Sequence, residues 1–172
     1  ASCLVGSEMC IRDRNYPITV QLGPVIGALA AGNTVVLKPS ELSMHTAQLI
    51  ADLWPKYMDP DTSAIVNGGI AQATALLDER FEHIFYTGSG RVGRIVAEKA
   101  ARWLCPTTLE LGGKSPVIVD ASADLRIAAR RTLWAKAFNA GQTCIAPDYV
   151  LVERKVQDLS LIHISEPTRQ EA

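Results

Sequence analysis

The chain has 172 residues, a length sufficient for one ordinary domain with a buried core. Hydrophobic residues make up 48% of the chain and charged residues 20%, which is typical of a soluble globular protein and excludes a disordered one. The net charge of −1 excludes a strong basic field for nucleic acid, and the longest apolar stretch, at residues 22–31, is about half of a membrane-spanning helix.

Between residues 15 and 158 the sequence alternates between helical and strand patterns. In chain order, these patterns predict a helix at 22–31, a strand at 33–39, a helix at 43–57, a strand at 64–66, a helix at 70–77, a strand at 82–86, a helix at 92–103, strands at 107–111 and 116–119, a helix at 124–138 and a strand at 149–152. Repeated strand–helix units favour a parallel, doubly wound α/β sheet.

Three of these helices carry further expectations. Residues 22–31 are apolar nearly all round and stop at Gly32, which predicts a buried helix with a glycine cap. Pro55 is expected to end or kink the helix at 43–57. One face of the helix at 92–103 is expected to hold the apolar residues Val92, Ile95, Val96 and Ala100.

Both ends of the chain differ in kind from the middle. Residues 3–14 and 159–169 resemble translated sequencing-adapter DNA, and the two peptides are encoded by reverse complements of each other up to Asp13. An ordinary variable tail at each end would leave that relation unexplained. We therefore expect residues 1–14 and 159–172 to be artefacts and the natural segment to span about residues 15–158.

The natural segment then keeps two cysteines, Cys105 and Cys144. They fit neither a disulfide framework nor a zinc site, so no metal is expected and a reducing compartment is the default. Cys105 reads as a small core hydrophobe. His45 and His83 have no cysteine near them in the sequence, and we expect them to lie on a helix surface and in a strand.

A glycine-rich turn follows the predicted strand at 82–86. Residues 88–93, Gly-Ser-Gly-Arg-Val-Gly, match the G-x-G-x-x-G spacing and open the next helix. Glycines there let the main chain approach a pyrophosphate, and the helix N-terminus offers it unpaired amides. The alternative is a plain strand-to-helix turn. Glu110 stands where a ribose-binding acid is expected, but it sits between an apolar strand and paired glycines, so we do not assign it to ribose.

Two reactive residues lie in tight glycine-containing motifs. Glu110 belongs to Leu-Glu-Leu-Gly-Gly-Lys-Ser-Pro at 109–116, and Cys144 ends Gly-Gln-Thr-Cys at 141–144. A cysteine can bond covalently to a carbonyl carbon, and a separate carboxylate can activate the water that breaks the bond. A lone cysteine is more often a core hydrophobe, but the glycine-bounded loop and the matched Glu110 favour the catalytic interpretation.

Five ordered motifs together resemble the aldehyde dehydrogenase family. They are Asn-Tyr-Pro at 15–17 and the runs at 33–41, 85–89, 110–116 and 141–144. The run at 142–150 looks most like the class 3 branch, which favours medium-chain and aromatic aldehydes. The resemblance covers nearly all of the natural segment. It implies a partial Rossmann-like dinucleotide-binding domain at 15–112 and, at 113–158, the start of a second α/β catalytic domain.

The same resemblance implies the chemistry of each reactive residue. Cys144 would attack the aldehyde to give a thiohemiacetal, and loss of hydride to NAD(P) would leave a thioester. The side-chain amide of Asn15 and the main-chain amide of Cys144 would stabilise the oxyanion. Glu110 would activate the water that releases the carboxylic acid. Lys114 is expected to be structural.

Coenzyme contacts follow from the resemblance as well. Lys38 and Glu41 would hold the adenosine ribose, Ser89 beside Gly88 would contact the pyrophosphate, and Leu111 and Gly112 would lie near the nicotinamide. A carboxylate at the ribose disfavours a 2′-phosphate, which favours NAD, although class 3 enzymes often accept NADP. Alternatively, Lys38 caps a strand end in solvent and Glu41 begins the next helix, where acids suit the dipole.

Departures from the family bear on the whole protein. Arg14 stands where the family has tryptophan, and the family's first strands, later catalytic motifs and oligomerisation segment are missing. We therefore expect this chain alone to aggregate or be inactive. The full-length protein is expected to be a cytoplasmic homodimer acting on a small aldehyde and not on nucleic acid; some class 3 members carry a C-terminal membrane tail. The competing hypothesis is a non-catalytic nucleotide-binding module with an incidental cysteine.

Overall fold

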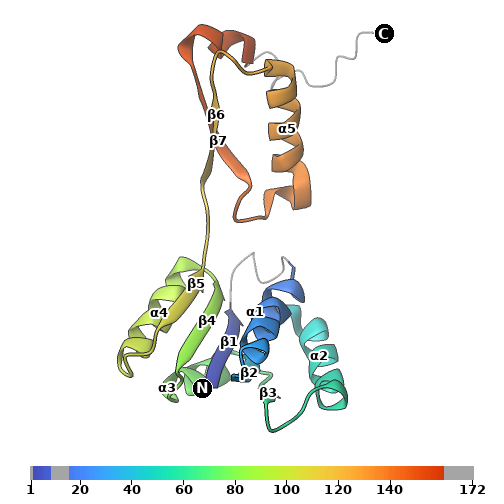
Figure 1. Ribbon diagram of the computed structural model, residues 1–172, viewed down its shortest axis with the longest axis vertical. Helices are drawn as coiled ribbons and strands as arrows, with labels where there is room; N and C mark the ends of the chain where they lie inside the picture. The colour runs from blue at the N-terminus through green and yellow to red at the C-terminus, as the bar shows by residue number, and fades with distance from the viewer. Residues whose placement is uncertain (1, 9–15, 161–172) are drawn as a thin grey trace. The chain divides into compact units, whose positions relative to one another are not determined.

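The computed structural model describes the main chain of residues 2–8 and, with side chains, residues 16–160. The chain divides into two compact units, Ala1–Gly112 and Gly113–Ala172 (Figure 1). Asn15 and residues 161–172 lie outside the described residues.

The first unit contains a five-stranded parallel sheet in the order β3-β2-β1-β4-β5. The strands are β1 (Ser2–Glu8), β2 (Thr34–Lys38), β3 (Ser63–Ile65), β4 (His83–Gly88) and β5 (Thr107–Glu110). From β1 the chain builds outward through β2 and β3, and it then returns to β4 on the other side of β1. This order confirms the predicted doubly wound sheet.

Among the described residues of this unit, four helices join the strands and cover both faces of the sheet (Figure 1). They are α1 (Thr19–Ala30), α2 (Met44–Tyr57), α3 (Ile70–Asp78) and α4 (Gly90–Ala101), with a short 3-10 turn, η2 (Glu41–Ser43), before α2. One core packs Val25 of α1 and Trp54 of α2 against β2. The other packs α3 and α4 against Ile84 and Tyr86, while Phe85 between them joins the first core. Successive side chains of β4 therefore point to opposite faces of the sheet and pack into two different cores.

Strand β1 is absent from the predicted elements, because residues 1–14 were expected to be foreign to the natural segment. The structure pairs it on both sides: Cys3 lies opposite Val35 in β2 and opposite His83 in β4. Parallel pairing is made by main-chain amides and carbonyls, which every residue except proline supplies in full. This segment can therefore complete the sheet through its main chain, although it was left out of the predicted elements.

One detail of the predicted helices is wrong, and the structure refines two others. Helix α1 is not buried all round: Val25 is buried, whereas Ile26 is 68% exposed. Ile95 of α4 is 46% exposed, because the buried stripe runs at intervals of four residues through Val92, Val96 and Ala100. Helix α2 runs to Tyr57 as predicted, so Pro55 does not end it, since a proline in the last turn removes little of the ladder.

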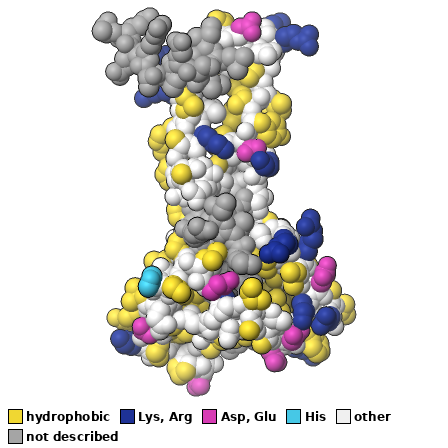
Figure 2. Space-filling model, turned by 180° about the vertical axis from the view of Figure 1, so that it is seen from behind, with side chains coloured by type: hydrophobic (Ala, Val, Ile, Leu, Met, Phe, Trp, Pro, Cys, Tyr) yellow, Lys and Arg dark blue, Asp and Glu magenta, His cyan; other side chains and the backbone are white. Residues whose placement is uncertain are grey.

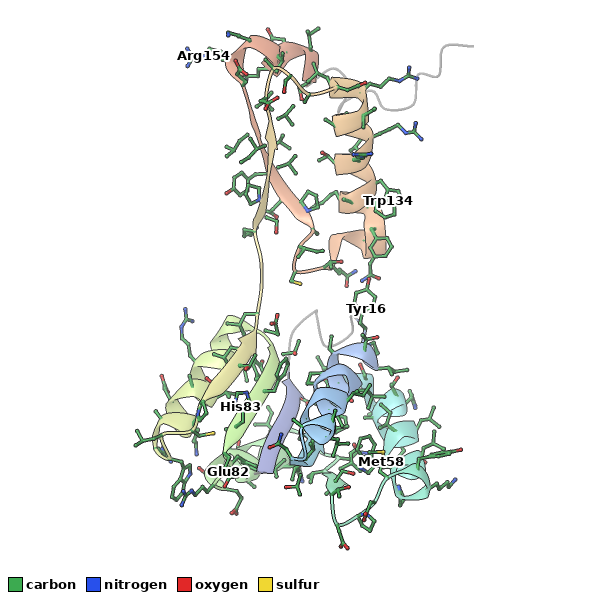
Figure 3. All side chains as sticks on the ribbon, viewed as in Figure 1. Tyr16, Met58, Glu82, His83, Trp134 and Arg154 are labelled. Atoms are coloured by element: carbon green, nitrogen blue, oxygen red, sulfur yellow. The ribbon has the colours of Figure 1, made fainter. Side chains whose placement is uncertain are left out.

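The second unit pairs two parallel strands, β6 (Ser115–Val119) and β7 (Pro147–Val152), with helix α5 (Leu125–Ala137) packed against them (Figure 1). Asp124 caps α5, because its Oδ1 accepts a hydrogen bond of 3.0 Å from the amide of Ile127. Two unpredicted 3-10 turns, η3 (Phe138–Gly141) and η4 (Arg154–Val156), follow α5 and β7. Hydrophobic side chains show on the surface of this unit, among them Trp134, whose ring lies 5.4 Å from that of Phe138 (Figures 2 and 3).

Within the described residues, no helix combines the length and apolar character needed to cross a bilayer. The same residues contain no group of three His, Cys, Asp or Glu side chains placed to hold a metal ion.

Candidate active site

Cys144 lies on an exposed turn of the second unit, whereas Cys105 is buried in the first. The amide of Ala146 donates to the carbonyl of Thr143 at 3.0 Å, which places Cys144 in the middle of a four-residue turn. Among the described residues, the amide N–H of Cys144 donates no hydrogen bond. The turn therefore presents both a thiol and a free main-chain donor.

A left-handed run of main chain leads into this turn. Asn139, Ala140 and Gly141 have φ values of 50°, 55° and 72°. Only glycine adopts this region without steric cost, and asparagine tolerates it better than most residues. Gly141 is also needed for space, because a Cβ there would lie 3.1 Å from the carbonyl oxygen of Lys136. This geometry explains the glycine three positions before Cys144.

Glu110 ends strand β5, where it pairs with Thr87 of β4 and is exposed. Leu111 and Gly112 follow it at the end of the first unit, and Cys144 belongs to the second. The structure therefore places Glu110 at an exposed strand end of the first unit and Cys144 on an exposed turn of the second. Asn15, the expected oxyanion donor, lies outside the described residues.

The glycine-rich turn joins β4 to α4. Gly88 is buried at the end of the strand, and the Oγ of Ser89 accepts a hydrogen bond of 3.3 Å from the amide of Val92 as the N-cap of α4. Gly93 is packed tightly, because a Cβ there would lie 3.0 Å from Leu111 Cδ2. The third glycine thus permits close helix–strand packing, its role in dinucleotide-binding folds. It also places α4 against Leu111, the residue expected beside the nicotinamide.

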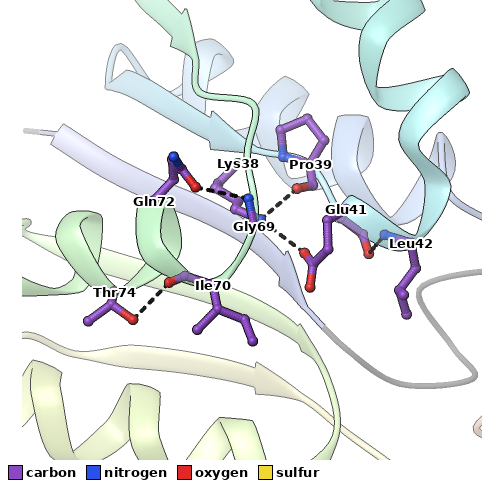
Figure 4. Close-up of polar contacts among 9 residues, drawn as sticks. Lys38, Pro39, Glu41, Leu42, Gly69, Ile70, Gln72 and Thr74 are labelled. Atoms are coloured by element: carbon purple, nitrogen blue, oxygen red, sulfur yellow. Dashed lines mark hydrogen bonds and ion pairs between the residues drawn. The ribbon is translucent and has the colours of Figure 1, made fainter.

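Lys38 and Glu41 come together at the end of β2 (Figure 4). Lys38 is 2% exposed, and its Nζ donates to the carbonyl of Pro39 at 3.0 Å and to Glu41 Oε2 at 3.2 Å. The alternative of a solvated strand cap for Lys38 is therefore wrong. Glu41 does begin a helical turn, η2, as its alternative proposed, while its carboxylate is also the ion-pair partner of Lys38.

The Lys38–Glu41 pair and the glycine-rich turn lie at the carboxyl ends of the parallel strands. Lys38 stands at the carboxyl end of β2, and Gly88 stands at the carboxyl end of β4, on the other side of β1. The direction of chain building reverses at β1, and ligands of such sheets bind outside the carboxyl ends at this reversal. His83 lies at the opposite end of β4, where its Nε2 is 3.0 Å from Thr108 Oγ1 in the neighbouring strand (Figure 3). It is a strand residue, as expected.

Gly113 and Ser115 lie near Cys144 and belong to the motif that carries Glu110, but the sequence alone assigns them no role. The structure brings both against the carbonyl group of Cys144, within the second unit. The paired glycines of the motif were the available signal, because a glycine that is not needed for a turn often marks a close main-chain approach.

Known proteins resemble this chain over nearly all of its length. The pattern of the aldehyde dehydrogenase family matches residues 5–170. Mouse "Aldehyde dehydrogenase family 3 member A2" is 51% identical over 165 residues, covering 96% of this chain and 34% of that protein. Rat "Aldehyde dehydrogenase, dimeric NADP-preferring" is 52% identical over 154 residues, covering 90% of this chain and 34% of that protein. The solved structure "Substrate bound state of Staphylococcus Aureus AldH" superposes with a TM-score of 0.85 at 41% identity. The match covers 98% of this chain and 36% of that one.

The chain spans about a third of the length of the curated relatives it matches. The expected resemblance, including its class 3 character, is confirmed by these matches. The parallel sheet, the glycine-rich turn and the exposed cysteine accord with the same conclusion. This chain belongs to the aldehyde dehydrogenase family.

Proposed function

We propose that the whole protein oxidises an aldehyde to a carboxylic acid with NAD or NADP. The observation that carries the proposal is the contrast between the two cysteines. Cys144 is exposed on a tight turn with a free amide, whereas Cys105 is a core residue whose thiol donates a hydrogen bond to the carbonyl of Pro106. A cysteine kept only for packing is usually buried. The placement of Cys144 supports a nucleophile.

The proposed chemistry assigns one task to each residue. The thiolate of Cys144 adds to the carbonyl carbon, and the amide N–H of Cys144 donates to the oxygen that becomes negative. A bound dinucleotide would supply the hydride acceptor, and loss of hydride from the thiohemiacetal would leave an acyl thioester on Cys144. Glu110 takes a proton from water as that water attacks the thioester, which releases the acid and restores the thiolate of Cys144. Asn15 is proposed as the second oxyanion donor.

Three features of the first unit support binding of the dinucleotide. Gly88 and Ser89 precede the N-terminus of α4, where unpaired amides and the helix dipole favour a pyrophosphate. Gly93 permits the close packing found in such folds. Lys38 and Glu41 lie at the same sheet edge and are proposed to hold the adenosine ribose, with Leu111 and Gly112 proposed near the nicotinamide.

Both coenzymes suit the Lys38–Glu41 pair. The carboxylate of Glu41 repels a ribose 2′-phosphate, but the ammonium of Lys38 only 3.2 Å away offsets part of that repulsion. The pair is therefore expected to lower the affinity for NADP without abolishing it. A relative named for its NADP preference is consistent with that tolerance.

Activity of the full-length gene product tests the proposal. We expect absorbance of the reduced coenzyme to rise when aldehyde is added, and we expect Cys144→Ala to abolish that rise. Cys105→Ala is the matched control, and it should keep its turnover per folded molecule. A non-catalytic nucleotide-binding module would instead bind the coenzyme without turnover, and undiminished activity in Cys144→Ala would refute the mechanism.

We propose a homodimer, following the dimeric relative, and a cytoplasmic location. Light scattering of the full-length protein tests the first, and fractionation of cells tests the second.

We also propose that residues 1–14 and 159–172 are translated adapter sequence. The proposal is supported by the two peptides being encoded by reverse complements of each other up to Asp13. Against it, the family match extends into both segments, and β1 falls in the first of them. Resequencing of the locus decides the matter: an intact reading frame encoding both peptides would show the proposal to be wrong.

A further inference from the structure

Gly113 makes the closest main-chain approach to Cys144. A Cβ atom built on Gly113 would overlap the carbonyl oxygen of Cys144 and would lie 3.1 Å from its carbonyl carbon. The φ of Gly113 lies outside the left-handed region that favours glycine, so the requirement there is for space alone. Any larger residue at 113 must push the carbonyl group of Cys144 aside, by on the order of 1 Å for an ordinary contact.

Ser115 contacts the same carbonyl group. Its Oγ donates to the carbonyl oxygen of Cys144 at 3.5 Å, which is long for a hydroxyl donor and therefore weak. Ser115 begins β6 and pairs with Pro147, three residues after Cys144, so the first residues of β6 and β7 hold the two ends of this contact together. The register slips by one residue at this point and leaves Asp148 unpaired in β7.

Asp148 ties the same corner to the helix. Its carboxylate lies 3.0 Å from Lys114 Nζ and 3.9 Å from Lys136 Nζ, near the end of α5. The two ammonium groups are half or more exposed, so these ion pairs contribute little energy. The fixed geometry at Cys144 therefore comes chiefly from the main-chain contact at Gly113.

We infer that Gly113 and Ser115 are positioning residues that fix the carbonyl of Cys144 and thereby orient its thiol and its free amide N–H. This inference rests on the proposed function of Cys144 as nucleophile. A carbonyl held from one side leaves the two reactive groups of the same residue on a main chain that cannot rotate freely. The motif that carries Glu110 thus has a second task, because three and five residues later it braces the nucleophile.

Substitutions in the full-length protein test the brace. Gly113→Ala should slow the burst of reduced coenzyme that accompanies acylation by about a hundredfold, the loss typical of a 1 Å misplacement. Ser115→Ala should slow it by about threefold, in keeping with a long neutral hydrogen bond, and Ser115→Thr should restore it. Both losses should recur in the rate at which iodoacetamide alkylates Cys144, followed by mass spectrometry.

Two variants serve as matched controls. Ser122→Ala removes a hydroxyl that bonds to Asp120 at the far end of β6, and Gly27→Ala adds a methyl group where nothing lies within 4 Å. Neither should change the burst or the alkylation rate. Melting temperatures of all variants show whether a loss reflects unfolding, which a merely structural role would predict.

The outcomes separate the inference from the function on which it rests. Activity retained by Cys144→Ala would overturn the proposed function. An inactive Cys144→Ala together with wild-type burst and alkylation rates in Gly113→Ala and Ser115→Ala would overturn the inference alone. If Gly113→Ala does not fold, Ser115→Ala and its rescue by threonine decide.

Discussion

Leu104 offers the sharpest test of the energetics of this fold. It has a φ of 52°, in the left-handed region, and its side chain is 91% exposed just beyond α4. The amide of Cys105 donates to the carbonyl of Ala100 at 3.0 Å, and the amide of Leu104 donates to the carbonyl of Ala101 at 3.1 Å. This is the Schellman arrangement, in which the left-handed position is usually glycine.

The effect of Leu104→Gly can be worked from three terms. A side chain in the left-handed region costs about 1–2 kcal/mol, which glycine avoids. Glycine loses more chain entropy on folding, about 0.5–1 kcal/mol. The side chain is almost fully exposed, so little hydrophobic burial is lost. We therefore expect a net stabilisation of about 0.5–1 kcal/mol and a rise of a few degrees in melting temperature.

Leu104→Ala is the matched control, because it removes the side chain but keeps the unfavourable conformation. Urea unfolding of both variants in the full-length protein, followed through the transition that contains α4, measures the difference. Leu104→Gly should be more stable than both the parent and Leu104→Ala. Equal stability of the two variants would refute the assignment of strain to this residue.

Two further predictions concern charged pairs. Glu41→Gln should raise the affinity for NADP relative to NAD by about tenfold, because it removes a partly screened charge beside the proposed 2′-phosphate position. The matched control, Glu98→Gln at an exposed position, should leave this ratio unchanged. Isothermal titration measures both affinities for each variant. The hydrogen bond from Lys99 lowers the pKa of Asp78, with Arg102 adding a smaller attraction, so this carboxylate stabilises the fold above its unfolded pKa of about 3.9 and loses that contribution as the pH falls through its folded pKa. Asp78→Asn should therefore lower the melting temperature at pH 6 and have no such effect near pH 2; an equal deficit at both pH values would contradict this origin.

Local pattern was sufficient where a single element decides the outcome. The strand predicted at 33–39 is found at Thr34–Lys38, because an apolar, β-branched run between Gly32 and Pro39 has few alternatives. Helix α5 begins where Asp124 offers a cap. Local pattern failed where a partner is needed: Ile26 and Ile95 are apolar, yet only the packing of the sheet decides which side of each helix is covered.

The candidate site divides in the same way. The identity of Cys144 and Glu110 follows from motifs, and the exposure of Cys144 agrees with its expected role. Burial of Lys38 could not be predicted, because a lysine at a strand end is ordinarily solvated and only the turn that returns Glu41 to it makes burial affordable. The brace at Gly113 joins residues some thirty positions apart in the chain, beyond the reach of any local pattern.

The place of β1 in the sheet has a consequence for the order of folding. Cys3 pairs with His83, although the two are separated by most of the first unit. Closing so long a loop carries an entropic penalty and slows folding. A ribosome adding about 5–20 residues per second releases β4 several seconds after β1. During that interval β1 has one edge available for other chains, and the pairing of β1 is completed only after β4 has been synthesised.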